Sequence, residues 1–172
     1  MKCPSCGHQN LPGIDACERC QTSLTQVDVR EVQTDVERSL MKDQIKSLQP
    51  VEPLTVDLKT TLKQAIQIMR DKNIGCVVVT GDAGKLAGIL TERDLLQKVA
   101  GQNLDYDQCR VEGFMSPSPE TSKKEHPLAY ALHRMIISDI RYLPLVDEND
   151  RPEGIISSRD VIAYINTHYC RS

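Results

Sequence analysis

Apolar and polar residues follow a regular order from about residue 50 onward. The order predicts an extended segment, a helix, a strand, a turn, a strand and a second helix. The first helix has one apolar face, formed by Leu62, Ala65, Ile66 and Met69. The apolar run Cys76–Val79 predicts a short buried strand, and 81–84 predicts a turn. Leu86–Leu90 then predicts the second strand, and Glu92–Val99 the second helix.

The same order occurs a second time. A shift of 66 positions aligns residues 53–94 with 119–160 without a gap. Most identical pairs are apolar or turn residues: Pro53/Pro119, Thr55/Thr121, Leu62/Leu128, Ala65/Ala131, Met69/Met135, Ile74/Ile140, Gly88/Gly154 and Ile89/Ile155. The pairs Arg93/Arg159 and Asp94/Asp160 are polar and stand where a strand runs into a helix, so core packing does not explain them. Two such units can cover each other's open sheet face about a pseudo-twofold axis.

The N-terminal part of the chain has a different composition. Residues 1–24 show no helical or strand period, and four of the seven cysteines lie in this segment. The pairs Cys3-x2-Cys6 and Cys17-x2-Cys20 have the spacing of two metal-binding turns, and Gly7 suits the first turn. The segment resembles a short zinc ribbon, so we expect a structural Zn²⁺. A four-thiolate iron site and a redox dithiol are the alternatives.

An amphipathic segment connects the cysteine-rich part to the repeats. Val29, Val32, Val36 and Leu40 recur at helical spacing, and Pro50 ends the pattern. The pattern leaves open whether this helix lies on the main domain or pairs with its twin in a dimer. We therefore expect four segments: a zinc ribbon at 1–24, a helical linker at 25–48, and repeats at 49–105 and 106–172.

Composition limits the classes of function. The chain has 172 residues, 40% hydrophobic residues and a net charge of −3, so it lacks the basic surface of a general nucleic-acid-binding protein. The sequence contains neither an apolar run long enough to span a bilayer nor a secretory signal. We expect a cytoplasmic protein without membrane contact, in which cysteines bind metal or remain free thiols.

Two motifs carry a resemblance to a known family. Gly88-Ile89-Leu90-Thr91-Glu92-Arg93-Asp94 and Gly154-Ile155-Ile156-Ser157-Ser158-Arg159-Asp160 resemble the closing signature of cystathionine-β-synthase (CBS) domains. Phe114-Met115-Ser116-Pro117 resembles the entry to a second domain. The resemblance covers roughly residues 40–166. It implies an α+β fold of two β-α-β-β-α CBS repeats (a Bateman module), a sensor of adenosine-containing ligands, and a homodimer.

The candidate ligand-binding residues lie at these strand-to-helix turns. Backbone N–H groups at a helix start attract phosphate, and a carboxylate can accept hydrogen bonds from ribose hydroxyls. The candidates are Thr91, Arg93 and Asp94 in the first repeat and Ser157, Arg159 and Asp160 in the second. The same Ser/Thr-x-x-Asp pattern also describes a helix capping box, which needs no ligand.

The resemblance adds residues at the start of each central strand. It assigns Ile74, Gly75 and Cys76 to the Asp160 site, and it assigns Ile140, Arg141 and Tyr142 to the Asp94 site. Gly75-Cys76-Val77-Val78 differs strongly from Arg141-Tyr142-Leu143-Pro144, so the two clefts are expected to be unequal. AMP, ADP, ATP, S-adenosylmethionine and a dinucleotide remain possible ligands.

The sequence does not indicate catalysis. None of the four histidines stands in a catalytic motif, and His133 is interpreted as a solvated helix residue. We expect a regulatory module that passes ligand occupancy to an effector protein of unknown identity. The alternative is a nucleic-acid-associated zinc-ribbon protein whose CBS pair serves as a dimerisation scaffold.

Overall fold

The computed structural model describes residues 2–10, 14–24 and 35–169. The predicted helical positions Val29 and Val32 and the thiol of Cys170 lie outside these residues. The elements in chain order are α1 (Asp35–Lys42), η1 (Ile45–Leu48), β1 (Thr55–Asp57), α2 (Leu62–Asp71), β2 (Cys76–Thr80), η2 (Asp82–Gly84), β3 (Leu86–Thr91), α3 (Glu92–Lys98), η3 (Val111–Gly113), β4 (Ser116–Pro117), α4 (Leu128–Ile137), β5 (Tyr142–Val146), β6 (Pro152–Ser157) and α5 (Ser158–Tyr169). No helix in the described ranges is both long and apolar enough to cross a membrane.

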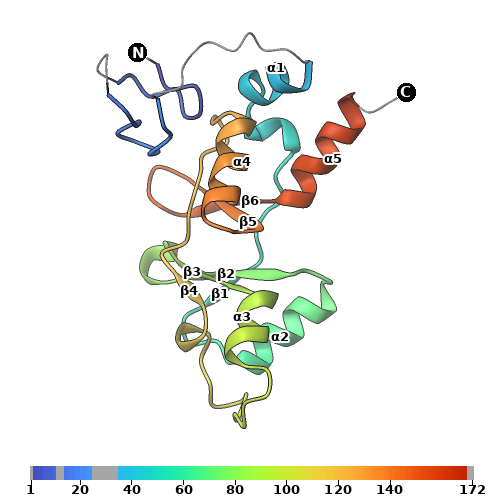
Figure 1. Cartoon of the computed structure of the whole chain (residues 1–172). Coiled ribbons are helices and arrows are strands. Elements are labelled where there is room, and N and C mark those ends of the chain that lie inside the picture. Colours follow the sequence, from blue (N-terminus) through green and yellow to red (C-terminus); the bar gives the residue numbers. More distant parts are fainter. Residues whose placement is uncertain (1, 11–13, 25–34, 170–172) are drawn as a thin grey trace. The chain divides into compact units, whose positions relative to one another are not determined.

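Contacts divide the chain into two compact units. Unit 1 comprises residues 1–50, 122–141 and 156–172, and unit 2 comprises 51–121 and 142–155. Unit 2 contains a sheet in the order β1-β2-β3-β4, in which β1 and β2 are parallel and the other pairs are antiparallel. Figure 1 shows α2 and α3 on the same face of this sheet.

The core of unit 2 explains why this sheet and its helices form together. Its buried apolar residues come from every layer: Val56, Leu62, Ala65, Met69, Val77, Val79, Leu90, Val99 and Val111. Four of the five residues of β2 are buried, as the apolar run predicted. Removal of this aliphatic surface from water is the main force that stabilises the unit.

In unit 1, α1, α4 and α5 pack against one another. The predicted linker helix is not continuous within the described residues, because α1 ends at Lys42 and η1 starts at Ile45. At this break the N–H of Ile45 donates to the carbonyl of His126, and the Ile45 side chain is fully buried. A contact distant in sequence therefore interrupts the helix.

The two repeats share local geometry as well as sequence. The helices α2 and α4 bury equivalent residues, namely Leu62, Ala65 and Met69 in one and Leu128, Ala131 and Met135 in the other. After these helices, Asn73 and Asp139 adopt equivalent left-handed conformations, with φ of 51° and 48°. The next amides, of Ile74 and Ile140, donate back to the helix carbonyls of Met69 and Met135.

Candidate functional site

The first candidate box is formed at the start of α3. The hydroxyl of Thr91 donates to Oδ2 of Asp94 at 2.6 Å, and the backbone N–H of Thr91 donates to the same oxygen at 2.9 Å. In return, the backbone N–H of Asp94 donates to Oγ1 of Thr91 at 3.2 Å. This is the reciprocal geometry of a capping box, which satisfies amides that the first turn of a helix leaves without partners.

The second candidate box has the same internal geometry. The hydroxyl and the backbone N–H of Ser157 donate to Oδ2 of Asp160 at 2.7 and 2.6 Å, and the N–H of Asp160 donates to Oγ of Ser157 at 3.3 Å. The capping interpretation of the repeated pattern is therefore confirmed in both copies. In each box the second carboxylate oxygen, Oδ1, takes no part in the hydrogen bonds of the motif.

The surroundings of the two carboxylates differ. Asp94 is only 5% exposed, and its Oδ1 accepts hydrogen bonds from Nζ of Lys98 at 2.7 Å and Oγ of Ser116 at 2.9 Å. Burial raises the pKa of Asp94, but its hydrogen bonds with Lys98, Thr91 and Ser116 outweigh this and lower the pKa below its ordinary value. Asp160 is exposed, and among the described residues no group donates to its Oδ1.

The residue one turn after each box accounts for part of this difference. Lys98 holds Asp94 and also donates to the carbonyls of Phe114 and Met115, at 2.9 and 3.1 Å. The repeat places Tyr164 at the equivalent position of the second copy, and its hydroxyl donates to Asp43 at 2.9 Å. The first carboxylate is thus already neutralised by Lys98, whereas no cation among the described residues forms an ion pair with the second.

Tyr142 lies beside the first box, in the unit that holds Asp94. Its hydroxyl donates to Oε2 of Glu92 at 3.3 Å, and Glu92 immediately follows Thr91. The same two side chains occupy the space where a Cβ on Gly75 would stand, so the glycine leaves room for them. The Tyr142 side chain thus lies next to the box to which the resemblance assigns it, and its part in ligand binding remains a prediction.

The other residues at the strand starts have mainly structural contacts. The N–H of Glu92 donates to the carbonyl of Gly75, and in the second copy the N–H of Ser158 donates to that of Arg141, each at 2.9 Å. Cys76 is buried opposite Thr91 in the sheet, and burial, with the nearby charge of Glu92, raises the pKa of its thiol to about 12. Its thiol therefore stays protonated at neutral pH, and the thiolate is the reactive form of cysteine.

The remaining predicted residues take other positions. Ile74 packs against the unit 2 core, and the side chains of Arg93, Arg141 and Arg159 are exposed. Gly75 and Cys76 belong to unit 2 and Asp160 to unit 1, so their assignment to one site stays a prediction. Sequence reasoning did not identify Lys98, Ser116 or Glu92. The i, i+4 spacing of Asp94 and Lys98 was the available signal for the first of these.

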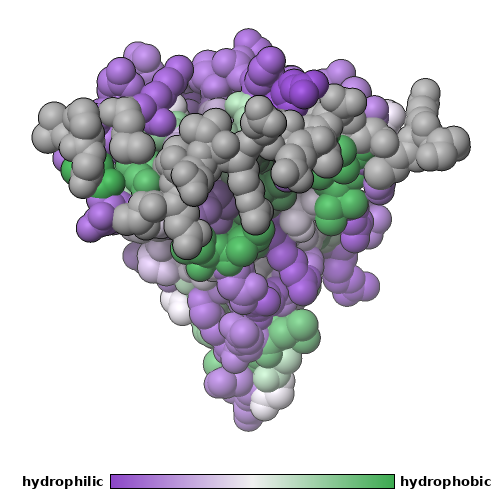
Figure 2. All heavy atoms as spheres, turned by 45° about the horizontal axis from the view of Figure 1, so that its top comes forward, coloured by the Kyte–Doolittle hydropathy of each residue, from purple (hydrophilic) through white to green (hydrophobic). Residues whose placement is uncertain are grey.

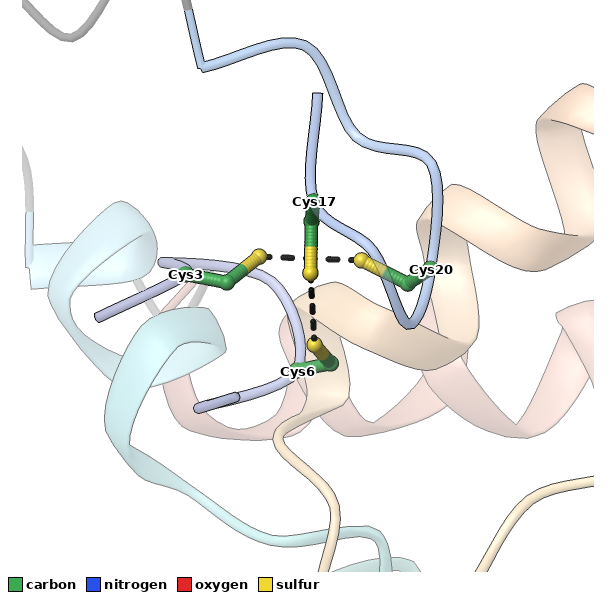
Figure 3. A group of neighbouring side chains, drawn as sticks. All are labelled: Cys3, Cys6, Cys17 and Cys20. Atoms are coloured by element: carbon green, nitrogen blue, oxygen red, sulfur yellow. Dashed lines mark hydrogen bonds between the residues drawn. The ribbon is translucent and has the colours of Figure 1, made fainter. Parts of the chain in front are cut away.

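The four N-terminal cysteines converge on one point. Figure 3 shows their side chains directed toward one another, and all four sulfurs lie within 4.8 Å of each other. The Sγ atoms of Cys3 and Cys20 are 3.6 Å apart, as are those of Cys6 and Cys17. A tetrahedral metal with bonds of about 2.3 Å to sulfur would separate its ligands by about 3.8 Å. The cluster therefore fits a four-thiolate metal site.

The two cysteine turns are built alike. The N–H of Cys3 donates to the carbonyl of His8, and the N–H of Cys17 to that of Thr22, each at 2.8 Å. Gly7, with φ of 71°, and Gln21, with φ of 59°, take equivalent left-handed positions. This confirms the expectation that Gly7 suits a tight turn. The pattern then repeats at an interval of fourteen residues, with Thr22 in the place of His8.

The surroundings of the cysteines shift their pKa values in different directions. Burial raises the pKa of Cys3 and Cys6. Burial also raises the pKa of Cys17, but hydrogen bonds from the backbone of Cys20 and Arg19 and from the Asn10 side chain lower it to about 6. Such donors stabilise thiolates, the form of cysteine that binds metal.

The cysteine segment packs on helix α4. Besides the sulfurs, Leu24 is buried in the cluster, and Ile14 and Tyr130 pack against it. His133 is half-buried, and its Nε2 lies 3.3 Å from Oγ1 of Thr22. The interpretation of His133 as a solvated residue was therefore wrong, because a partner 111 residues away in sequence covers it.

Comparison with known proteins accounts for the two repeats. The profile of the family described as CBS domain matches residues 38–101 and, separately, 111–167, which is more than half of the chain. An uncharacterized protein of Methanopyrus kandleri, MK0525, is 34% identical over 94 residues, 55% of this chain and 48% of that protein. An uncharacterized 17.7 kDa protein of Acidianus ambivalens is 26% identical over 129 residues, 74% of this chain and 77% of the other. The chain thus spans about half the length of the first relative and three quarters of the second.

Solved structures with the same fold have also been found. The CBS-domain containing protein ATU1752 of Agrobacterium tumefaciens is 30% identical with a TM-score of 0.62, over 69% of this chain and 88% of that one. The CBS domain pair of protein MJ0100, solved in complex with 5′-methylthioadenosine and S-adenosyl-L-methionine, is 23% identical with a TM-score of 0.65. That match covers 72% of this chain and 96% of the other, and at this identity it shows a shared fold.

Proposed function

The chain belongs to the CBS domain family, and on this basis we propose that it is a non-catalytic regulatory module that binds an adenosine-containing ligand at the Asp160 box. The predicted tandem repeat is confirmed by the two separate family matches. The ligand, its site and the effector that responds to occupancy are proposals. The exposed, unneutralised carboxylate of Asp160 is the observation that carries them.

Charge and hydrogen bonding favour Asp160 over Asp94 as the ligand site. A carboxylate that binds both hydroxyls of a ribose needs an oxygen that is not already satisfied. Both oxygens of Asp94 accept hydrogen bonds from protein groups, whereas in the described residues Asp160 uses only Oδ2. A ligand at Asp94 would have to displace Lys98 or Ser116, so the second copy is the better site. That MJ0100, a protein of the same fold, binds adenosine compounds supports this ligand class.

The test is a binding screen with matched charge variants. AMP, ADP, ATP and S-adenosylmethionine are titrated calorimetrically into the wild type, Asp160→Asn and Glu148→Gln. Glu148 is an exposed carboxylate in the β5–β6 turn, so its variant makes the same charge change outside the motif. We expect at least one ligand to bind, Asp160→Asn to lose tenfold or more in affinity, and Glu148→Gln to bind like the wild type. If none of these ligands binds, the proposed function is wrong.

We propose further that the cysteine cluster is a structural zinc ribbon. Among the described residues of the segment, only Leu24 and Ile14 add apolar surface to the sulfurs, and a bound metal would supply further folding energy. Zinc and iron form similar bonds to thiolate, so the geometry fits both. Metal analysis of the purified protein should find about one zinc per chain, and Cys6→Ser should abolish it. The visible absorption of a ferric tetrathiolate would instead establish iron.

Self-association through the CBS pair completes the proposal. Unit 1 leaves three isoleucines largely exposed, Ile136 (75%) and Ile137 (68%) on α4 and Ile162 (57%) on α5. On the face shown in Figure 2, hydrophobic side chains form separate groups among hydrophilic ones. Exposed isoleucines on packed helices favour a protein partner, and a second copy is the simplest. Light scattering should report a dimer that Ile136→Lys weakens, and a monomeric wild type would refute this part.

A further inference from the structure

Thr22 connects the cysteine cluster to helix α4 through side-chain atoms. Its Oγ1 lies 3.0 Å from Sγ of Cys20 and 3.3 Å from Nε2 of His133. Tyr130, one turn earlier on α4, packs against the same cluster. All of these groups belong to unit 1.

The contact is a special feature of the second cysteine turn. The two turns have the same backbone hydrogen bonds, but the first carries His8 where the second carries Thr22. Only the second turn therefore has a hydroxyl at this position, and that hydroxyl contacts the ring of His133 on α4. Since the turns are otherwise alike, the metal site alone does not require this hydroxyl.

A bound metal would fix the direction of these hydrogen bonds. A metal-bound thiolate carries no proton, so the sulfur of Cys20 can only accept, and the Thr22 hydroxyl must donate to it. The Thr22 oxygen then accepts from an N–H at Nε2 of His133. A protonated Cys20 thiol has no such requirement. Metal binding therefore selects the form of the His133 ring, on α4, in which Nε2 carries a hydrogen.

Helix α4 also leads to the Asp160 box. Just beyond its C-terminal end, the N–H of Ile140 donates to the carbonyl of Met135 at 3.0 Å. The carbonyl of the next residue, Arg141, accepts from the N–H of Ser158, the residue after Ser157, at 2.9 Å. Helix α4 thus contacts the cysteine cluster, and the segment that follows it is hydrogen-bonded to Ser158, the residue between Ser157 and Asp160 that starts α5.

We propose that Thr22 and His133 are positioning residues that couple metal binding at the four cysteines to helix α4 and, through it, to the Asp160 box. The last step rests on the proposed function, because it requires a ligand there. Coupling of this kind is reciprocal, so metal would change ligand affinity by the same factor as ligand changes metal affinity. Outer hydrogen bonds to metal ligands typically change metal affinity about tenfold or more.

The experiment uses the full chain with three variants. Thr22→Val removes the hydroxyl at constant shape, His133→Phe removes the ring donor, and Thr22→Ser keeps the hydroxyl as the matched control. Zn²⁺ affinity is measured by competition with a chelator, and the absorption of the Co²⁺-substituted protein reports the sulfur environment. We expect Thr22→Val and His133→Phe to lose about tenfold in Zn²⁺ affinity and to shift the Co²⁺ bands, and Thr22→Ser to behave like the wild type.

Two further measurements follow the coupling along α4. Hydrogen exchange of the α4 amides should slow when Zn²⁺ is added to the wild type, and should respond less in Thr22→Val. AMP and S-adenosylmethionine should bind the Zn²⁺-loaded and metal-free proteins with different affinities. Equal Zn²⁺ affinities in all variants, or hydrogen-exchange rates of the α4 amides that do not change with Zn²⁺, would overturn the inference even if a ligand binds. If AMP, ADP, ATP and S-adenosylmethionine all fail to bind while α4 still responds to Zn²⁺, the coupling to α4 stands and the proposed function and the step to the Asp160 box fail.

Discussion

The boxes at Asp94 and Asp160 have the same hydrogen bonds within the motif and different ones around it. Three bonds of almost equal length join hydroxyl, amide and carboxylate in each copy. Outside the motif, Asp94 is enclosed by Lys98 and Ser116, while Asp160 is exposed. A repeated motif therefore determines its own local geometry, whereas the neighbouring residues decide whether it is available to a ligand.

The largest expected effect concerns the stability contributed by each carboxylate. Asp94→Asn would leave the half-buried ammonium of Lys98 without its counter-charge, so we expect a loss of about 3 kcal/mol in the free energy of unfolding. Asp160→Asn removes only an exposed capping charge and should cost less than about 1 kcal/mol. Urea denaturation at neutral pH measures both. Equal losses would show that the two environments do not differ energetically.

The pH dependence of stability should sharpen the same contrast. The pKa of Asp94 is below its ordinary value in the folded protein, so its contribution to stability is present above pH ~4 and is lost as the pH falls through the lowered pKa. Lys98→Met removes the strongest stabilising partner of the carboxylate but leaves it buried. The variant should be less stable by about 2 kcal/mol at neutral pH, and its acid-induced loss should begin at a higher pH.

Lys63→Met provides the matched control for this experiment. Lys63 forms an ion pair with Asp107 at 2.8 Å, but both side chains are more than half exposed, so the pair should contribute little. Urea denaturation between about pH 7 and 3 should give parallel curves for the control and the wild type. A Lys98→Met curve that runs parallel to them as well would contradict the role given to Lys98.

Much of the fold and of both boxes could be predicted from the sequence. The contacts that could not be predicted have a common physical cause. The helical faces, the buried strands and both boxes follow from patterns shorter than ten residues or so, where local geometry dominates. The contact of Ser116 with Asp94 depends on β4 pairing with β3, as Ser116 pairs with Ile89. Likewise, Thr22 meets His133, and Ile45 meets His126, only after the chain folds back on itself. No local pattern reports such contacts.

Another variant introduces a neutralising cation into the second copy. Tyr164 is the equivalent of Lys98, so Tyr164→Lys places an ammonium four residues after Asp160, the spacing at which Lys98 holds Asp94. We expect this variant to bind the adenosine ligand about tenfold more weakly, because the new cation competes for Oδ1. Tyr164→Phe is the control, since it also loses the hydrogen bond to Asp43 but adds no charge. Calorimetry should find its affinity close to that of the wild type.

The smallest effects should come from exchanging the hydroxyl residues of the two boxes. Thr91→Ser and Ser157→Thr keep the group that donates to the carboxylate, so each should change the free energy of unfolding by less than about 0.5 kcal/mol. Thr91→Val and Ser157→Ala remove that group, and each should cost about 1 kcal/mol. Urea denaturation of the four variants separates the contribution of the hydroxyl to the free energy of unfolding from that of the rest of the side chain. If the exchange alone were as costly as removal, the motifs themselves would differ, and the contrast between the copies could not be assigned to Lys98 and Ser116. Near-neutral exchanges would instead leave the surroundings of each carboxylate as the source of the difference.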